Sequence, residues 1–135
     1  MNPARRYLET QVTTAPKEQL LLMLLDGAMR FTRQAREHMV ARDISAASTL
    51  YLKGQAIALE LVAALDAALE PRLRANLSGL YMFVFRKLVD ANLSHETAPA
   101  DEALHILEKL RTMWGEAVVR MKAESAPVSA EKNPA

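Results

Sequence analysis

The apolar residues of this chain recur every three or four positions along four long stretches, the spacing of helices that bury one face. These stretches span about residues 14–41, 45–69, 72–93 and 101–122. Pro16 suits a first helical turn, Ser45 is a plausible cap, and Pro71 marks a boundary between helices. Because the connections are short, the pattern predicts an all-α fold, an antiparallel up-down four-helix bundle.

One stripe of each predicted helix is expected to face the core. The stripes are Leu20, Leu24, Ala28, Phe31 and Ala35 with His38 or Met39; Leu50, Ile57, Leu61 and Leu65 with the small residues Ala47, Gly54, Ala58 and Ala68; Leu73, Leu77, Leu80, Tyr81, Val84, Leu88 and Ala91; and Ala103, Leu107, Leu110, Trp114, Ala117 and Met121.

The run from Leu20 to Leu25 contains more apolar side chains than one helix face can bury, because successive residues are turned by about 100°. It is also far shorter than the roughly 20 apolar residues that cross a bilayer, so no membrane insertion is expected. We therefore expect Leu20, Leu21 and Leu24 to face the bundle, Met23 to lie at its margin, and Leu22 and Leu25 to face outward.

Three predicted helices carry a second apolar stripe. Its members are Leu22, Leu25 and Met29 on the first helix, Leu52 and Leu59 on the second, and Met82, Phe85 and Val89 on the third. This spacing predicts grooves that bind amphipathic helices of another protein. Two alternatives stay open: the residues lie at wide core margins, or the same faces bury one another in a homodimer.

Composition narrows the classes of protein. Half of the residues are hydrophobic, only 5% are aromatic and none is Cys, which favours packed helices and excludes disulfides and thiolate metal sites. A net charge of +1 provides no basic field, so nucleic-acid binding is not expected. No apolar segment follows Arg5 and Arg6, so a secretory signal is not expected and the cytosol is the expected location.

The two ends of the chain lack helical periodicity. Residues 1–13 are expected to form an N-terminal arm, with Tyr7 as a candidate anchor, and residues 123–135 a disordered tail. The bundle domain then spans residues 14–122.

Catalytic and metal-binding patterns are scarce. Glu102 and His105 give the chain's only Glu-x-x-His, a motif that di-metal bundles use twice, and both residues are expected on the polar side of their helix. No Gly-rich phosphate loop or nucleophile elbow occurs. We therefore expect a protein without enzymatic activity, cofactor or metal.

Several short motifs resemble the FliS family of flagellin export chaperones. They are Tyr7; Thr14-Ala15 leading into the run 20–31 with Asp26-Gly27-Ala28 and Phe31; Gln34-Ala35; Lys53-Gly54-Gln55; Leu65-Asp66; Asn76-Leu77; Leu80-Tyr81; Arg86, Leu88 and Ala91-Asn92; and Leu107, Leu110-Arg111 and Trp114. The resemblance covers about residues 7–117, and its specificity comes from the order and spacing of the motifs together.

The resemblance implies a cytosolic type III flagellar export chaperone. Such a protein binds the C-terminal helical segment of flagellin, prevents premature polymerisation, and assists delivery to the export gate component FlhA. In the family an arm bearing a Tyr, matched here by Tyr7, can cover part of the cargo surface. The family commonly has an aromatic residue where this chain has Leu25 and an acidic one where it has Met82, which leaves the cargo preference open.

Overall fold

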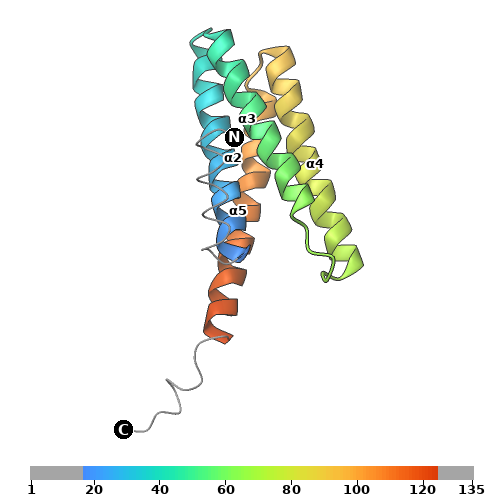
Figure 1. Cartoon of the computed structure of the whole chain (residues 1–135). Coiled ribbons are helices and arrows are strands. Elements are labelled where there is room, and N and C mark those ends of the chain that lie inside the picture. The colour runs from blue at the N-terminus through green and yellow to red at the C-terminus, as the bar shows by residue number, and fades with distance from the viewer. Residues whose placement is uncertain (1–16, 125–135) are drawn as a thin grey trace, which may run out of the picture.

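Four helices arranged in a ring make up the computed structural model, which describes residues 17–124. They are α2 (Lys17–Val40), α3 (Ile44–Ala63), α4 (Pro71–Ser94) and α5 (Ala98–Glu124). Helix α2 packs against α3 and α5, and α4 packs against the same two helices (Figure 1). The predicted all-α four-helix bundle is confirmed. The predicted arm, with Tyr7, and residues 125–135 of the predicted tail lie outside the described residues.

Side chains and backbone geometry define the helix ends. Asp43, rather than the predicted Ser45, caps α3, and its carboxylate accepts a hydrogen bond from the Ala46 amide at 3.4 Å. Glu70 caps α4 by accepting hydrogen bonds from the amides of Arg72 and Leu73, both at 3.0 Å. His95 ends α4 in the left-handed region, with φ of 62°, a common helix terminator.

Helix α3 ends at Ala63, six residues before the predicted boundary at Leu69. In the following loop the Asp66 carboxylate accepts a hydrogen bond from the Ala68 amide at 2.8 Å. Asp side chains that bond nearby amides in this way compete with helix formation. The guanidinium of Arg74 donates to the Ala67 carbonyl at 2.9 Å and ties the loop to α4.

Helix α3 approaches both α2 and α4 closely at Gly54. A side chain at Gly54 would place its Cβ 3.0 Å from Leu88 Cδ1 and 3.6 Å from Thr32 Oγ1, so glycine permits this close approach. Thr32 is the buried polar side chain among the described residues, and its hydroxyl donates to the Ala28 carbonyl at 2.7 Å. Tyr51 is fully buried, whereas the predicted core residue Leu50 is half-buried.

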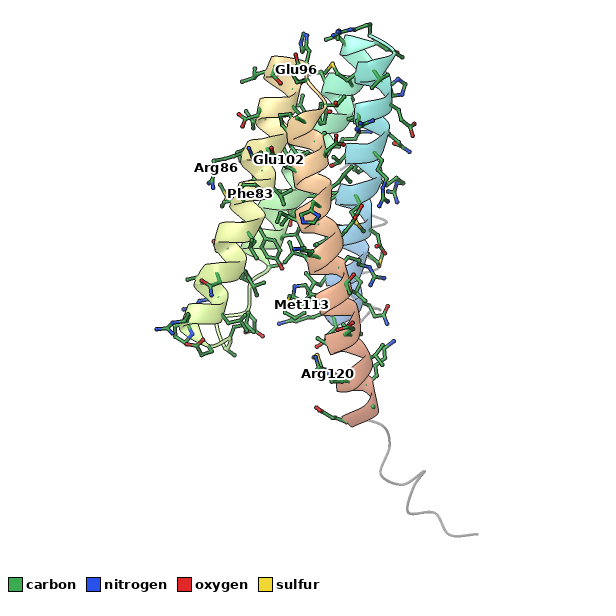
Figure 2. All side chains as sticks on the ribbon, turned by 180° about the vertical axis from the view of Figure 1, so that it is seen from behind. Phe83, Arg86, Glu96, Glu102, Met113 and Arg120 are labelled. Atoms are coloured by element: carbon green, nitrogen blue, oxygen red, sulfur yellow. The ribbon has the colours of Figure 1, made fainter. Side chains whose placement is uncertain are left out.

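The bundle opens at one end. The N-terminal half of α4 diverges from the C-terminal half of α5, below the labels Phe83 and Met113 in Figure 2. Leu73, Leu80 and Met121 are 41%, 38% and 41% exposed, so their assignment to the core was wrong. They lie on the inward stripes of α4 and α5, but these helices diverge at this end, so the three side chains stay partly exposed.

Ion pairs connect α5 to both of its neighbours. Arg33, Arg36 and Asp26 of α2 pair with α5 at distances of 3.2, 2.6 and 2.8 Å; their partners are Glu108, Asp101 and Arg111. Lys87 of α4 pairs with Glu102 at 2.6 Å, and this hydrogen bond raises the pKa of the lysine. None of the four helices is long and apolar enough to cross a membrane.

Candidate functional site

An apolar surface extends over α3 and α4. Leu52 and Leu59 of α3 are 55% and 46% exposed, while Met82, Phe85 and Val89 of α4 are half-buried. We call these five residues the α3·α4 patch. It unites the second apolar stripes that the sequence predicts for the second and third helices.

Helix register explains why the five side chains form one surface. Leu52 and Leu59 are two helical turns apart, as are Met82 and Val89. The close approach of Gly54 and Leu88 defines the axial register of α3 against α4. Because α3 and α4 run antiparallel, Leu52 lies near the level of Val89, and Leu59 near that of Met82. The outer side of α4 is also hollowed around Phe85 and Val89.

The predicted outward face of α2 is largely buried. Leu25 is 0% and Met29 is 8% exposed, so the prediction that they line an outward groove is wrong. The buried stripe of α2 is turned by about one residue from the predicted one, because it runs through Thr32 rather than Phe31. The internal hydrogen bond of Thr32 removes the cost of burying its hydroxyl. Leu22 is half-buried and remains a candidate contact residue.

A second apolar surface lies in the cleft at the open end of the bundle. This cleft has a volume of about 160 Å³. Its apolar lining includes Leu21, Leu61, Leu65, Leu69, Trp114 and Met121. The Trp114 indole donates a hydrogen bond to the Tyr81 hydroxyl at 3.1 Å. Burial raises the pKa of Tyr81, and the indole hydrogen bond opposes this rise.

Sequence reasoning missed this cleft because periodicity alone cannot reveal where helices diverge. The local feature closest to the cleft is the early end of α3. Asp66, in the otherwise apolar segment 61–69, is the residue from which this early end could have been predicted.

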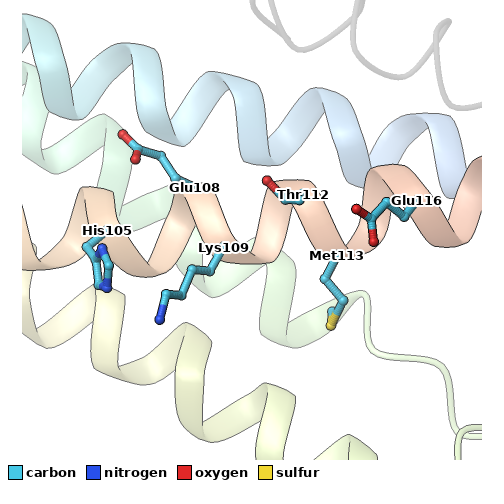
Figure 3. A pocket seen from close by; sticks show the side chains of 6 residues that line it. All are labelled: His105, Glu108, Lys109, Thr112, Met113 and Glu116. Carbon is cyan, nitrogen blue, oxygen red and sulfur yellow. The ribbon is translucent and has the colours of Figure 1, made fainter.

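The outer face of α5 is polar, and Figure 3 shows six side chains around a shallow hollow on it: His105, Glu108, Lys109, Thr112, Met113 and Glu116. Glu108 forms an ion pair with Arg33, and Glu102 forms one with Lys87. Within residues 17–124 no group of three or more candidate ligand side chains is arranged to hold a metal ion.

The described residues form a four-helix bundle that exposes apolar side chains on α3 and α4. A family model described as "Flagellar protein FliS" matches residues 1–121. The flagellar secretion chaperone FliS of Bacillus subtilis (strain 168) is 30% identical over 117 residues, which cover 87% of this chain and 86% of the relative. The flagellar secretion chaperone FliSB of Pseudomonas aeruginosa is 32% identical over 107 residues, 79% of this chain and 85% of the relative.

The flagellar secretion chaperone FliS of Salmonella typhimurium is 31% identical over 118 residues, covering 82% of this chain and 83% of the relative. The chain therefore belongs to the FliS family of flagellar secretion chaperones, a non-enzymatic family. The resemblance inferred from the sequence motifs is confirmed.

Proposed function

We propose that this protein binds the C-terminal helical segment of flagellin in the cytoplasm, keeps flagellin from polymerising prematurely, and assists its delivery to the export gate component FlhA. Membership of the FliS family supports this role. The observation that supports this binding site is the α3·α4 patch. Its apolar side chains repeat every two helical turns, the spacing that matches the apolar face of an amphipathic helix.

The patch can bind such a helix because its side chains still have apolar area to bury. Complete burial of an exposed Leu side chain contributes about 1.5–3 kcal/mol, and Leu52 and Leu59 retain about half of their area. Met82 adds an unbranched thioether that adapts to the shape of its partner. A cargo segment that folds on binding also loses conformational entropy, so a large wrapped surface is needed. Leu22 and Tyr7 are further proposed contact residues.

The test is calorimetric titration of the full chain with the C-terminal segment of flagellin. Leu59→Asp combined with Phe85→Asp is expected to weaken binding at least about tenfold, because each change puts a charge in the patch. Phe85 also packs against the core, so Leu52→Asp with Leu59→Asp is the second variant, in which both altered side chains are exposed.

Val40→Asp with Val119→Asp is the matched control, because these valines are 60% and 67% exposed and lie outside the patch. Unchanged affinity in a folded Leu52/Leu59 variant would remove the patch from the binding site. Equal weakening in the valine variant would show that added negative charge, rather than the patch, is responsible.

The alternative role is self-association through the same faces, which Leu52 and Leu59 favour because both are exposed in the single chain. Sedimentation without cargo at low micromolar concentration separates the two roles. A stable monomer near 15.0 kDa excludes an obligate homodimer.

A further inference from the structure

Two cations lie against one phenyl ring where α2 meets α3. The Arg30 guanidinium carbon is 5.1 Å from the centre of the Phe31 ring, and Lys53 Nζ of α3 is 5.5 Å from the same centre. The ring is half-buried, whereas both basic residues are exposed. We call these three residues the Phe31 site.

Arg30 and Lys53 differ from the basic residues that join the helices. Arg33, Arg36 and Arg111 each have a carboxylate partner across the α2·α5 contact. Between residues 17 and 124, neither Arg30 nor Lys53 has an ion pair or a side-chain hydrogen bond. The phenyl ring attracts both cations, each by about 0.5–1 kcal/mol at an exposed site, but it does not neutralise them.

We infer that the Phe31 site binds a carboxylate of the flagellin segment, an inference that rests on the proposed function. Arg and Lys offer several donors and no acceptor, and the planar guanidinium matches the two oxygens of a carboxylate.

The position of the site supports this assignment. Leu52 and Lys53 are consecutive exposed residues of α3, turned from each other by about 100°, and Lys53 reaches the Phe31 ring of α2, so the cations lie on the α2 side of α3 and the α3·α4 patch on its α4 side. A flagellin segment that continues from the patch across the exposed side of α3 can direct an acidic side chain toward them. Two cations on a chain of net charge +1 are too few for the phosphate contacts of a nucleic acid, which favours an acidic peptide.

The experiment compares Arg30→Gln/Lys53→Gln with the wild-type chain in calorimetric titrations with the flagellin segment. Binding by the variant is expected to be about tenfold weaker at low salt, and less dependent on salt than that of the wild type. Lys109→Gln with Arg120→Gln is the matched control: it removes the same charge from α5, where Lys109 lies in the polar hollow and Arg120 near the C-terminal end (Figures 2 and 3).

A double-mutant cycle identifies the partner group. Each Asp and Glu of the flagellin segment is changed in turn to its amide, and one change is expected to reproduce the loss without adding to that of the Arg30/Lys53 variant. Unchanged affinity of this variant, an equal loss in the α5 control, or additive effects for every carboxylate would overturn the inference and leave the proposed function intact. A wild-type chain that does not bind the segment would overturn both.

Discussion

Two buried tyrosines differ in the environment of their hydroxyl groups. The Tyr51 hydroxyl is buried and has no hydrogen-bond partner among the described residues, whereas the Tyr81 hydroxyl accepts a hydrogen bond from Trp114. Burial raises the pKa of the Tyr51 hydroxyl, and the Arg36 charge opposes this rise. An unpaired buried hydroxyl costs free energy that a phenyl ring of the same shape avoids.

The first prediction uses these tyrosines as a matched pair. Tyr51→Phe is expected to leave the free energy of unfolding unchanged or to raise it by about 1 kcal/mol, because only an unpaired hydroxyl is lost. Tyr81→Phe is expected to lower it by about 1 kcal/mol, because it leaves the Trp114 indole unpaired. Urea unfolding measures both, and equal destabilisation by the two changes would contradict the assignment.

Residue-level exposure was predictable only where the helical pattern was unambiguous. Leu77, Val84, Leu88, Leu107 and Leu110 are buried as their spacing predicts. The run 20–25 did not determine its own orientation, because six apolar residues in succession fit several helix rotations equally well. The partners that fix the rotation of α2 lie on α3 and α5, so Leu25 and Met29 could not be placed from their own helix.

At the scale of the element, the start of α4 is better defined than the start of α3. Pro71 occupies the first turn, where its missing N–H costs nothing, and the Glu70 carboxylate accepts two backbone hydrogen bonds. These bonds lower the pKa of Glu70. The cap thus contributes stability above the ordinary pKa of glutamate, and this contribution is lost as the pH falls through the lowered value.

The second prediction follows from the lowered pKa of Glu70. Glu70→Gln is expected to reduce stability at neutral pH, and the difference from wild type is expected to shrink as the pH falls through the lowered pKa of Glu70, where the wild-type carboxylate protonates. Urea midpoints across a pH series measure the difference. Glu116→Gln removes an exposed carboxylate of α5 and is the control. A difference for Glu70→Gln that persists at strongly acid pH would refute this account of the cap.

At the scale of the whole molecule, the packing is uneven from one end to the other. The centre holds Gly54, Thr32 and Leu88 in close approach, while the open end leaves Leu73 and Leu80 about two-fifths exposed. Exposed surface ion pairs contribute only about 0–1 kcal/mol each, so the α2·α5 pairs do not compensate for missing apolar contacts.

The third prediction concerns local opening. Backbone amides at the C-terminal end of α3 and in the first turns of α4 are expected to exchange hydrogen at least about tenfold faster than amides around Gly54 and Leu88, because fewer buried contacts hold them. Hydrogen-exchange mass spectrometry measures this contrast. Uniform protection along α3 and α4 would show that the open end is as stable as the centre.

The sequence by itself determined the all-α fold, its four helices and the FliS family, because helical periodicity and short motifs are local properties of the chain. It also placed Leu52 and Leu59 on an outward face. Only the tertiary structure decided which side of α2 is buried, that α3 and α4 share one apolar patch, and that one end of the bundle is open. These features depend on how neighbouring helices rotate, align and diverge, and the spacing within one helix does not encode that arrangement.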